Sequence, residues 1–256
     1  MKSISVCIPT YEMQGLGSQF LKHSFEVLLK QTYTDFDVVI SDHSQDDAVK
    51  KTCEEYMGRL DIHYYKNTNN IGSSSANINN CIKHAGGKLI KILFQDDFLF
   101  HERSLEDIVD HFDIQKDQWL MTACTHTRDG IHFFKSFCPT PNTIRSIWIK
   151  TVYSSPSTLT IVNDEPLFFD ESLLWFMDSD YYRRYYDKFG EPKILKPINV
   201  VNRLGSHQVS TSMATLSLQK NEFFRMLQKH EQGLHFWYYT VIGCIKYSLK
   251  AALLWK

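Results

Sequence analysis

The chain has 256 residues, 43% of them hydrophobic, which is enough for one large folded domain and excludes a disordered chain. Its formal net charge is −1, so no overall basic surface indicates a nucleic-acid partner. The six cysteines form no C-x-x-C pair, and neither a zinc site nor a redox dithiol is expected.

The first hundred residues alternate strand and helix patterns. Apolar strand runs cover 4–8, 38–40, 62–65 and 89–94, and the first is expected to stop at Pro9. Apolar residues at helical spacing lie between these runs, at Leu21, Phe25 and Leu28, at Val49, Cys53 and Met57 behind a capping Asp46, and over 74–85. This order predicts an α/β fold with an open, mostly parallel, Rossmann-like central sheet and helices on both faces.

Polar segments follow each of these four strands, at 9–12, 41–44, 69–72 and 95–97. In sheets of this kind ligands bind beyond the carboxyl ends of the strands. We therefore expect the polar rim formed by these segments to be the site.

The rest of the chain is less regular. Residues 101–215 are expected to form mixed strands and loops that share one core with residues 1–100, because no linker separates the two halves. Residues 216–256 combine aromatic and basic residues at helical spacing, in a segment too short to span a membrane. Two interpretations stay open for this tail: docking on the protein's own apolar groove, or attachment to a membrane surface.

The last strand run is followed by two adjacent carboxylates, Asp96 and Asp97. Such a pair is costly unless a cation or hydrogen-bond donors compensate it. Mg²⁺ or Mn²⁺ takes carboxylate oxygens and bridges phosphate oxygens, which suits a sugar-diphosphate leaving group. The alternative is that the pair caps the following turn.

The motifs over nearly all of residues 3–100 resemble, in order and spacing, the family 2 glycosyltransferases, which are inverting enzymes of the GT-A fold. The resemblance is carried by SVCIPTYE at 5–12, QTY at 31–33, FDVVISD at 36–42, NIG at 70–72 and AGGKLIKILFQDD at 85–97. It implies one GT-A domain in which residues 1–100 bind a nucleotide sugar and residues 101–215 face the acceptor, followed by a C-terminal helical tail over 216–256.

The resemblance also implies roles for single residues. The nucleotide pocket would be lined by Pro9, Thr10, Tyr11, Glu12, Asp42, His43, Asn77 and Asp96, with Tyr11 against the base and Asp96 near the ribose or a bound water. Asp97 would be the direct metal ligand, and His207 would lie close to the metal or the diphosphate. Two positions depart from the family: His43 stands where a second acid is frequent, and Asn77 where many relatives carry an arginine.

The segment 175–184 resembles the part of these enzymes that holds the catalytic base, with Met177-Asp178 in place of the usual Glu-Asp pair. Inverting transfer needs one carboxylate to take a proton from the acceptor hydroxyl. We expect Asp178 in this role, with Asp180 as the second choice. The alternative is that both acids cap a helix that runs to about Phe189.

The expected function is inverting transfer of a sugar from a nucleotide-diphosphate sugar, with UDP as the commonest nucleotide in the resembled family, and with Mn²⁺ or Mg²⁺. The acceptor would be a glycan or lipid-linked saccharide in cell-surface polysaccharide biosynthesis, such as O-antigen or capsule. A cytoplasmic protein without a signal peptide, peripheral on the inner face of the cell membrane, is expected. A nucleotidyltransferase is the first alternative, although residues 10–17 lack the basic residues that its phosphate loop needs. Non-catalytic nucleotide-sugar binding is the second.

Overall fold

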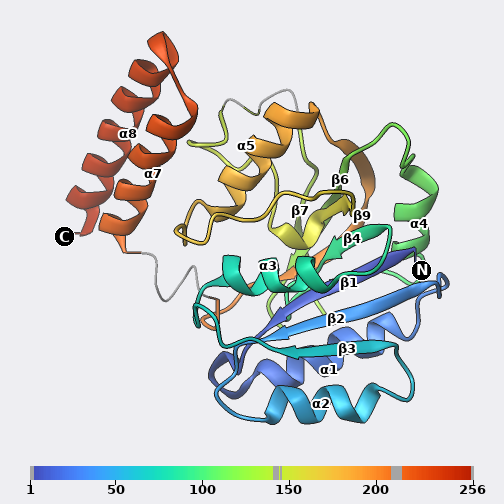
Figure 1. Cartoon of the computed structure of the whole chain (residues 1–256). Helices are drawn as coiled ribbons and strands as arrows, with labels where there is room; N and C mark the ends of the chain where they lie inside the picture. The colour runs from blue at the N-terminus through green and yellow to red at the C-terminus, as the bar shows by residue number, and fades with distance from the viewer. Residues whose placement is uncertain (1–2, 141–143, 145, 209–214, 255–256) are drawn as a thin grey trace.

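One nine-stranded sheet runs through the part of the chain that the computed structural model describes, residues 3–140, 144, 146–208 and 215–254. The strand order is β3-β2-β1-β4-β8-β6-β9-β5, and β7 pairs with β6 outside this path. Strands β1, β2 and β3 lie side by side in Figure 1. Residues 1–100 and 101–215 both contribute strands to this sheet, so the two halves are joined in one continuous sheet.

The sheet is parallel at its N-terminal side and mixed beyond it. The parallel neighbours are β1 (Ile4–Thr10), β2 (Phe36–Asp42), β3 (Ile62–Lys66) and β4 (Leu89–Ile92). The other strands are β5 (Phe98–Leu99), β6 (Trp119–Thr127), β7 (Phe133–Phe137), β8 (Leu159–Val162) and β9 (Lys193–Arg203). Strand β8 is antiparallel to both β4 and β6, whereas β6 and β9 run parallel.

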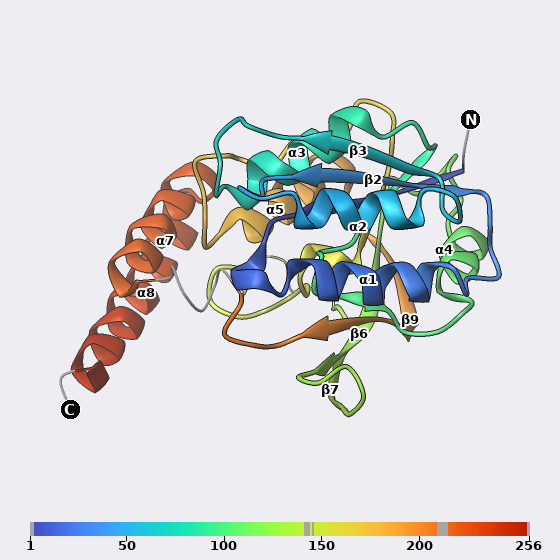
Figure 2. The ribbon, with the colours of Figure 1, turned by 90° about the horizontal axis from the view of Figure 1, so that it is seen from below.

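Helices cover both faces of the sheet and make a three-layered molecule (Figure 2). On one face lie α1 (Gly17–Leu28), α2 (Ala48–Tyr56) and α4 (Ser104–His111), which share an apolar cluster with alternate residues of β1 and β2. On the other lie α3 (Ser74–His84) and α5 (Met177–Phe189), whose cluster contains the intervening strand residues. Two short 3₁₀ turns, Met13–Gly15 and Pro156–Thr158, lie at the ends of strands.

The tail forms two antiparallel helices, α7 (Leu216–His230) and α8 (Gly233–Leu254), at one end of the molecule (Figure 1). Helix α7 buries Phe223, Met226 and Leu227 in the same apolar cluster as α5. Helix α8 packs on α7 through Tyr239 and Tyr247, which are 5% and 3% exposed. None of the described helices has the length and apolar character needed to cross a membrane.

The predicted alternation of strands and helices is confirmed. Several boundaries differ by one or two residues, and the structure explains three of these differences. Strand β1 continues through Pro9 to Thr10. Proline has no backbone N–H to donate to a neighbouring strand, but the pairing of β1 with β4 already ends at Cys7, so Pro9 interrupts no hydrogen bond on that side. Strand β4 stops at Ile92, because the Phe94 N–H turns away to the Ser157 hydroxyl at 2.9 Å. Helix α2 ends at Tyr56, so Met57 lies outside it and is exposed.

Candidate active site

The carboxyl ends of β1, β2 and β3 bring three polar residues side by side. Thr10 lies opposite Asp42, and Asp42 lies opposite Lys66, in the register of the parallel sheet. The turn after β4 then carries Asp96 and Asp97 to the same rim, since β4 runs parallel to β1. The predicted polar rim is therefore present in the fold.

Asp42 is fully buried and committed to contacts within the protein. Its Oδ1 accepts the Ser44 N–H at 2.8 Å and the Thr10 hydroxyl at 3.3 Å, while its Oδ2 accepts the Tyr64 hydroxyl at 2.7 Å. Lys66 Nζ lies 3.5 Å from the same Oδ2. Asp42 thus ties the ends of the first three strands together and leaves its charge balanced by Lys66.

Asn77 shapes the wall of the rim from the first turns of α3. Its amide nitrogen donates to the Thr10 carbonyl at 2.9 Å, and its amide oxygen accepts the Ser41 hydroxyl at 2.6 Å. The side chain is 4% exposed. An arginine at this position would carry a charge into a space that Asn77 fills with neutral hydrogen bonds.

His43 was predicted to bind the nucleotide, and one of its ring nitrogens makes no hydrogen bond to the described residues. Its side chain is buried, and no partner is found for its Nε2 among the described residues. Burial lowers the pKa of its imidazole, so the ring is neutral near pH 7. The buried hydroxyl oxygen of neighbouring Ser44 also has no hydrogen-bond partner within the described part of the chain. Buried polar atoms of this kind are normally satisfied, which makes this corner of the rim a place where a ligand's polar groups fit.

The loop after β1 is held by Gln95 and by His207. The Tyr11 N–H donates to Gln95 Oε1 at 3.0 Å, and Gln95 Nε2 donates to the Gly17 carbonyl at 2.8 Å. The Tyr11 hydroxyl donates to the His207 carbonyl at 2.9 Å. Glu12 lies half-buried in the same loop, with its Oε2 3.3 Å from the Gln45 N–H. The loop after β1 is therefore held beside the acid pair.

The two acids after β4 have different partners. Asp96 Oδ2 lies 3.0 Å from His207 Nε2, and both side chains are nearly buried. Asp97 Oδ1 accepts the Arg203 N–H at 2.8 Å, and its Oδ2 lies 3.4 Å from the Ser155 hydroxyl. Burial and then the neighbouring Asp96 carboxylate raise the pKa of Asp97 well above its usual range. The structure thus brings His207 to the acid pair, on the side of Asp96.

Arg203, at the end of β9, bonds to both residues of the acid pair, with its backbone N–H to Asp97 and its guanidinium to the Asp96 backbone. Its Nε donates to the Asp96 carbonyl at 3.1 Å, and its guanidinium lies over the rings of Phe20 and Phe98, 4.8 and 5.5 Å from their centroids. Sequence reasoning did not assign this role, because β9 is distant in the chain and its pairing with β6 has no local signal.

Lys91 is a second cation that sequence reasoning did not single out. It is fully buried in β4, where Nζ donates to the Ser157 carbonyl. Burial lowers its pKa to about 7, and the charge of Asp97 opposes that shift. A single lysine inside an otherwise apolar strand is the sequence signal that marks it.

The residues of the rim suit a divalent cation held jointly with a diphosphate. Among the described residues, no group of three or more His, Cys, Asp or Glu side chains is placed to hold a metal ion. Asp96, Asp97 and His207 offer two carboxylates and one imidazole in a buried setting. The hard oxygen donors fit Mg²⁺ or Mn²⁺, and diphosphate oxygens and water would complete the coordination.

The two candidate bases, Asp178 and Asp180, both lie in the first turn of α5. Asp180 is fully buried and forms ion pairs with Arg184 at 2.8 Å, Lys229 at 2.8 Å and His230 at 2.7 Å. Asp178 has no such cations among the described ion pairs, and it accepts the Ser179 N–H at 2.7 Å. Burial raises the pKa of Asp178 to about 6. These surroundings favour Asp178 over Asp180 as a proton acceptor.

Asp178 shares a face of α5 with a residue that bonds to the segment beside Asp97. Tyr182 follows it by four residues and so shares its helix face. The Tyr182 hydroxyl donates to the Ser154 carbonyl at 3.0 Å, and the next residue, Ser155, is the one that contacts Asp97. The predicted helix over these acids is confirmed to Phe189, but its N-cap, Phe176, makes no side-chain capping bond.

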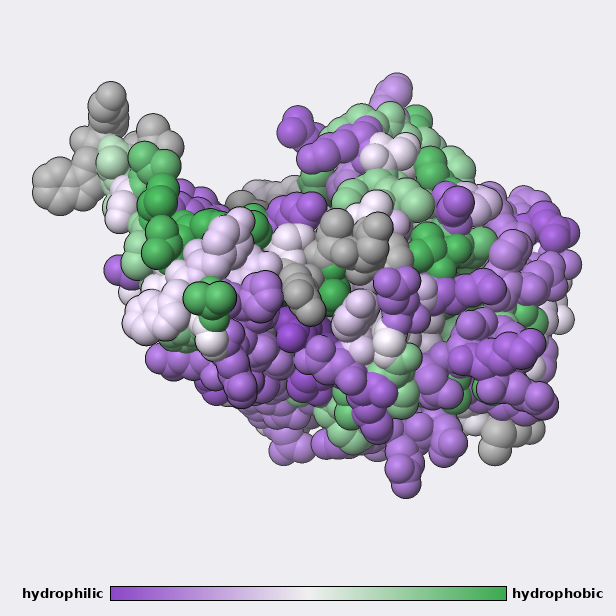
Figure 3. All heavy atoms as spheres, turned by 90° about the horizontal axis from the view of Figure 1, so that it is seen from above, coloured by the Kyte–Doolittle hydropathy of each residue, from purple (hydrophilic) through white to green (hydrophobic). Residues whose placement is uncertain are grey.

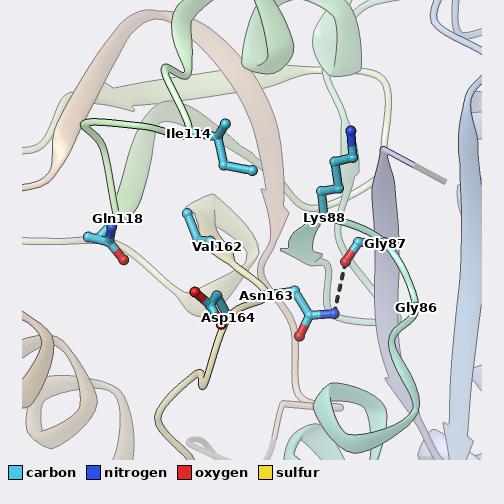
Figure 4. A pocket seen from close by; sticks show the side chains of 8 residues that line it. All are labelled: Gly86, Gly87, Lys88, Ile114, Gln118, Val162, Asn163 and Asp164. Carbon is cyan, nitrogen blue, oxygen red and sulfur yellow. Dashed lines mark hydrogen bonds between the residues drawn. The ribbon is translucent and has the colours of Figure 1, made fainter. Parts of the chain in front are cut away.

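A separate pocket lies at the opposite edge of the sheet (Figure 4). Its wall includes Gly87 before β4 and Asn163 after β8, and Asn163 Nδ2 donates to the Gly87 carbonyl at 2.8 Å. Because β4 runs from this edge towards Asp96, the pocket is not part of the polar rim.

The model of the family described as Glycosyl transferase family 2 matches residues 5–155, which is more than half of the chain. Poly(ribitol-phosphate) beta-N-acetylglucosaminyltransferase TarS of Staphylococcus aureus (strain MW2) is 25% identical over 181 residues, 68% of this chain. TarS of strain Mu50 / ATCC 700699 is 24% identical over 181 residues, also 68% of this chain. Both alignments span 30% of the relative, so this chain matches under a third of those proteins.

Solved structures share the fold. The crystal structure of S. aureus TarS 1-349 in complex with UDP-GlcNAc matches with a TM-score of 0.65 and 19% identity, over 90% of this chain and 68% of that one. Mannosyltransferase PcManGT from Pyrobaculum calidifontis, in complex with GDP-Man and Mn²⁺, matches with a TM-score of 0.61 and 14% identity, over 89% and 64%. The central sheet and its flanking helices therefore have the predicted GT-A arrangement.

Proposed function

The chain belongs to glycosyl transferase family 2, and on that premise we propose that it transfers a sugar, with inversion, from a nucleotide-diphosphate sugar to a saccharide. The observation that carries the proposal is the buried acid pair Asp96-Asp97 at the end of β4, held by Arg203 and His207. This is where the sheet rule places a ligand, and where a diphosphate and its cation offset the carboxylate charge.

The donor would lie along the rim with its nucleoside towards β1 and β2. The unpartnered Nε2 of His43 and hydroxyl of Ser44 would meet the base, while residues 9–12 and the Asp96 backbone line the ribose and phosphates. Asp42 and Asn77 would support this wall from behind, because their polar atoms are already bonded within the protein. A UDP-sugar is the first candidate, in keeping with the UDP-GlcNAc complex of TarS.

Asp97 would be the direct ligand of the Mn²⁺ or Mg²⁺ ion, with His207 close to the metal or the diphosphate and Asp96 near the ribose or a bound water. When bound, the cation supplies electrostatic stabilisation of the diphosphate as the glycosidic bond breaks. Arg203 keeps the Asp97 carboxylate oriented through its backbone N–H. Asp178 would take the proton from the acceptor hydroxyl, since its raised pKa suits a base that works near neutral pH.

The acceptor would be a glycan or lipid-linked saccharide of a cell-surface polysaccharide. The name of TarS, poly(ribitol-phosphate) beta-N-acetylglucosaminyltransferase, describes transfer of a sugar to a polymer acceptor and supports this class. The tail supports a location at a membrane surface, because α8 exposes an apolar stripe away from α7 (Figure 3). The stripe consists of Leu234, Trp237, Tyr238, Val241, Ile245 and Leu249, which are 56–89% exposed.

The charges of the tail match an anionic lipid surface. Both of its acids, Glu222 and Glu231, are buried against the body of the protein. The exposed charged side chains of the described tail are basic, among them Lys220, Arg225 and Lys250. Basic residues beside an apolar helix face favour attachment to anionic membranes.

A thermal-shift screen of nucleotide sugars, each with and without Mn²⁺, tests the donor and metal assignments. A ligand that binds only the folded state raises its midpoint, so one UDP-sugar should stabilise the protein, and more strongly with Mn²⁺. Asp97→Asn should remove the Mn²⁺-dependent part, since its amide oxygen keeps the Arg203 bond while the charge is lost.

The surface variant Asp113→Asn is the matched control, because Asp113 lies beyond α4 and its salt bridge is to Lys116. It should shift like the wild type. If Mn²⁺ increases the thermal shift equally in Asp97→Asn and Asp113→Asn, Asp97 is not a metal ligand. Binding without turnover of any saccharide acceptor would favour a non-catalytic binding protein.

A further inference from the structure

The carboxylate of Glu222, in α7, accepts three consecutive backbone N–H groups from a distant segment. Oε1 accepts from Leu174 at 2.9 Å, and Oε2 accepts from Trp175 at 2.8 Å and from Phe176 at 2.9 Å. The side chain is 5% exposed. Phe176 is the N-cap of α5 and has no side-chain cap from its own segment. Glu222 therefore supplies from α7 the acceptor that a helix start needs.

Asp178 lies two residues beyond the last of these N–H groups. Its carboxylate is bonded within its own turn, by the Ser179 N–H at 2.7 Å. Such a local bond moves with the backbone and does not tie the side chain to another element. The place of the Asp178 carboxylate therefore follows the backbone of residues 174–178.

The C-terminal end of α7 is attached to α5 by a different set of contacts. Lys229 and His230 pair with Asp180 at 2.8 and 2.7 Å. Glu231 accepts from Trp148 Nε1 at 2.9 Å and from Arg183 at 2.6 Å. These contacts hold α7 along α5, whereas the carboxylate of Glu222 acts directly on the backbone before Asp178.

We infer that Glu222 is a positioning residue for the transfer reaction: from α7 it fixes the backbone of residues 174–176 and so holds Asp178 in place at the start of α5. The inference rests on the proposed role of Asp178 as the base. It gives α7 a part in catalysis although none of its residues is placed at the polar rim.

The variant Glu222→Gln tests the inference without substrate. Glutamine keeps the size of the side chain, but it has one acceptor oxygen, and its amide hydrogens face an N–H group. The loosened segment would admit water to Asp178 and reduce the burial that raises its pKa. The Asp178 titration midpoint, followed by ¹³C NMR, should fall from about 6 towards the ordinary aspartate value.

Glu231→Gln is the matched control, since it makes the same change at the other end of α7 and leaves residues 174–176 bonded. Both variants should unfold at lower temperature, but the Asp178 midpoint should stay near 6 in Glu231→Gln. An unchanged midpoint in Glu222→Gln, or equal shifts in both variants, would show a purely structural role and overturn the inference.

Turnover of the donor selected by the thermal-shift screen separates this inference from the proposed function. Glu222→Gln should lower kcat by about 10- to 100-fold with little change in donor KM, because a misplaced base costs about that much. In an Asp178→Asn background the same change should lower kcat no further. Wild-type turnover in Asp178→Asn would reject Asp178 as the base. If Asp178→Asn is inactive but Glu222→Gln keeps the wild-type kcat, only the positioning role of Glu222 is rejected.

Discussion

Asp178 and Asp180 stand two residues apart in one helical turn, yet their surroundings give them opposite acid strengths. The ion pairs with Arg184, Lys229 and His230 lower the pKa of Asp180 to about 2, even though burial opposes this shift. Burial raises the pKa of Asp178 to about 6. A proton acceptor that works near neutral pH needs the second environment, because an acid paired with Arg184 and Lys229 is a much weaker base.

The pH dependence of turnover should follow Asp178. Below about pH 6 its carboxyl group is protonated and cannot accept a proton, so the wild-type rate should fall as pH decreases through that value. Asp178→Asn should lower kcat by about 10²- to 10⁴-fold and abolish this acidic limb, as expected for loss of a general base. The comparison of the two pH–rate profiles is the measurement. If the rate of Asp178→Asn still falls below about pH 6, another group is responsible for that fall.

Sequence reasoning located the rim at the residue scale but did not foresee how its side chains are paired. Asp96, Asp97 and residues 9–12 follow strands, so their positions are set by local patterns that a sequence shows. Arg203 and Ser155 reach Asp97 from segments 106 and 58 residues away. Such contacts depend on the strand order β8-β6-β9, and no local pattern encodes that order.

At the scale of single elements, the first four strands were predictable because each is a short apolar run between helices. The second half was not, because β8 is inserted antiparallel between β4 and β6, and β9 has bulged pairing with β6. A mixed sheet breaks the simple alternation of strand and helix on which the prediction depends. The tail was predicted as helical, and its docking on α5 through buried acids required the structure.

The contact between α7 and α8 should be sensitive to one glycine. Gly243 lies on the buried face of α8, where an added Cβ would overlap the ring of the fully buried Phe223. Alanine in place of glycine inside a helix normally stabilises by about 1 kcal/mol. Overpacking of a filled core costs about 1–3 kcal/mol. The second effect should win, and Gly243→Ala should lower the denaturation midpoint.

Ser248→Ala on the exposed face of the same helix is the control for this prediction. It also raises helix propensity but meets no neighbour, so its midpoint should equal or exceed that of the wild type. A stabilised Gly243→Ala variant would mean that Phe223 moves aside and that α8 is loosely packed.

The whole molecule combines one shared sheet with a tail that belongs to its core. Residues 1–100 and 101–215 contribute adjacent strands, and α7 adds Phe223, Met226 and Leu227 to the cluster beneath α5. Both interpretations left open by the sequence for the tail are therefore compatible: one side of the α7–α8 pair docks on the protein, while the stripe on α8 faces outward. Removal of the entire tail would expose the core, so point variants are needed to examine the outer face.

A triple variant, Trp237→Ser, Val241→Ser and Ile245→Ser, tests whether the stripe attaches the protein to a membrane. These side chains are 65%, 57% and 56% exposed, so their loss leaves the core intact. The wild type should sediment with vesicles of phosphatidylcholine and phosphatidylglycerol, and less with phosphatidylcholine alone, because the exposed charges of the tail are basic. The triple variant should lose at least about tenfold in vesicle partition, since three buried apolar side chains contribute well over 1.4 kcal/mol.

The control Ile131→Ser removes a side chain that is 73% exposed in the turn between β6 and β7, and it should bind like the wild type. Equal sedimentation of the triple variant, or a change in its oligomeric state in place of vesicle binding, would contradict the membrane assignment and point to a protein contact on α8.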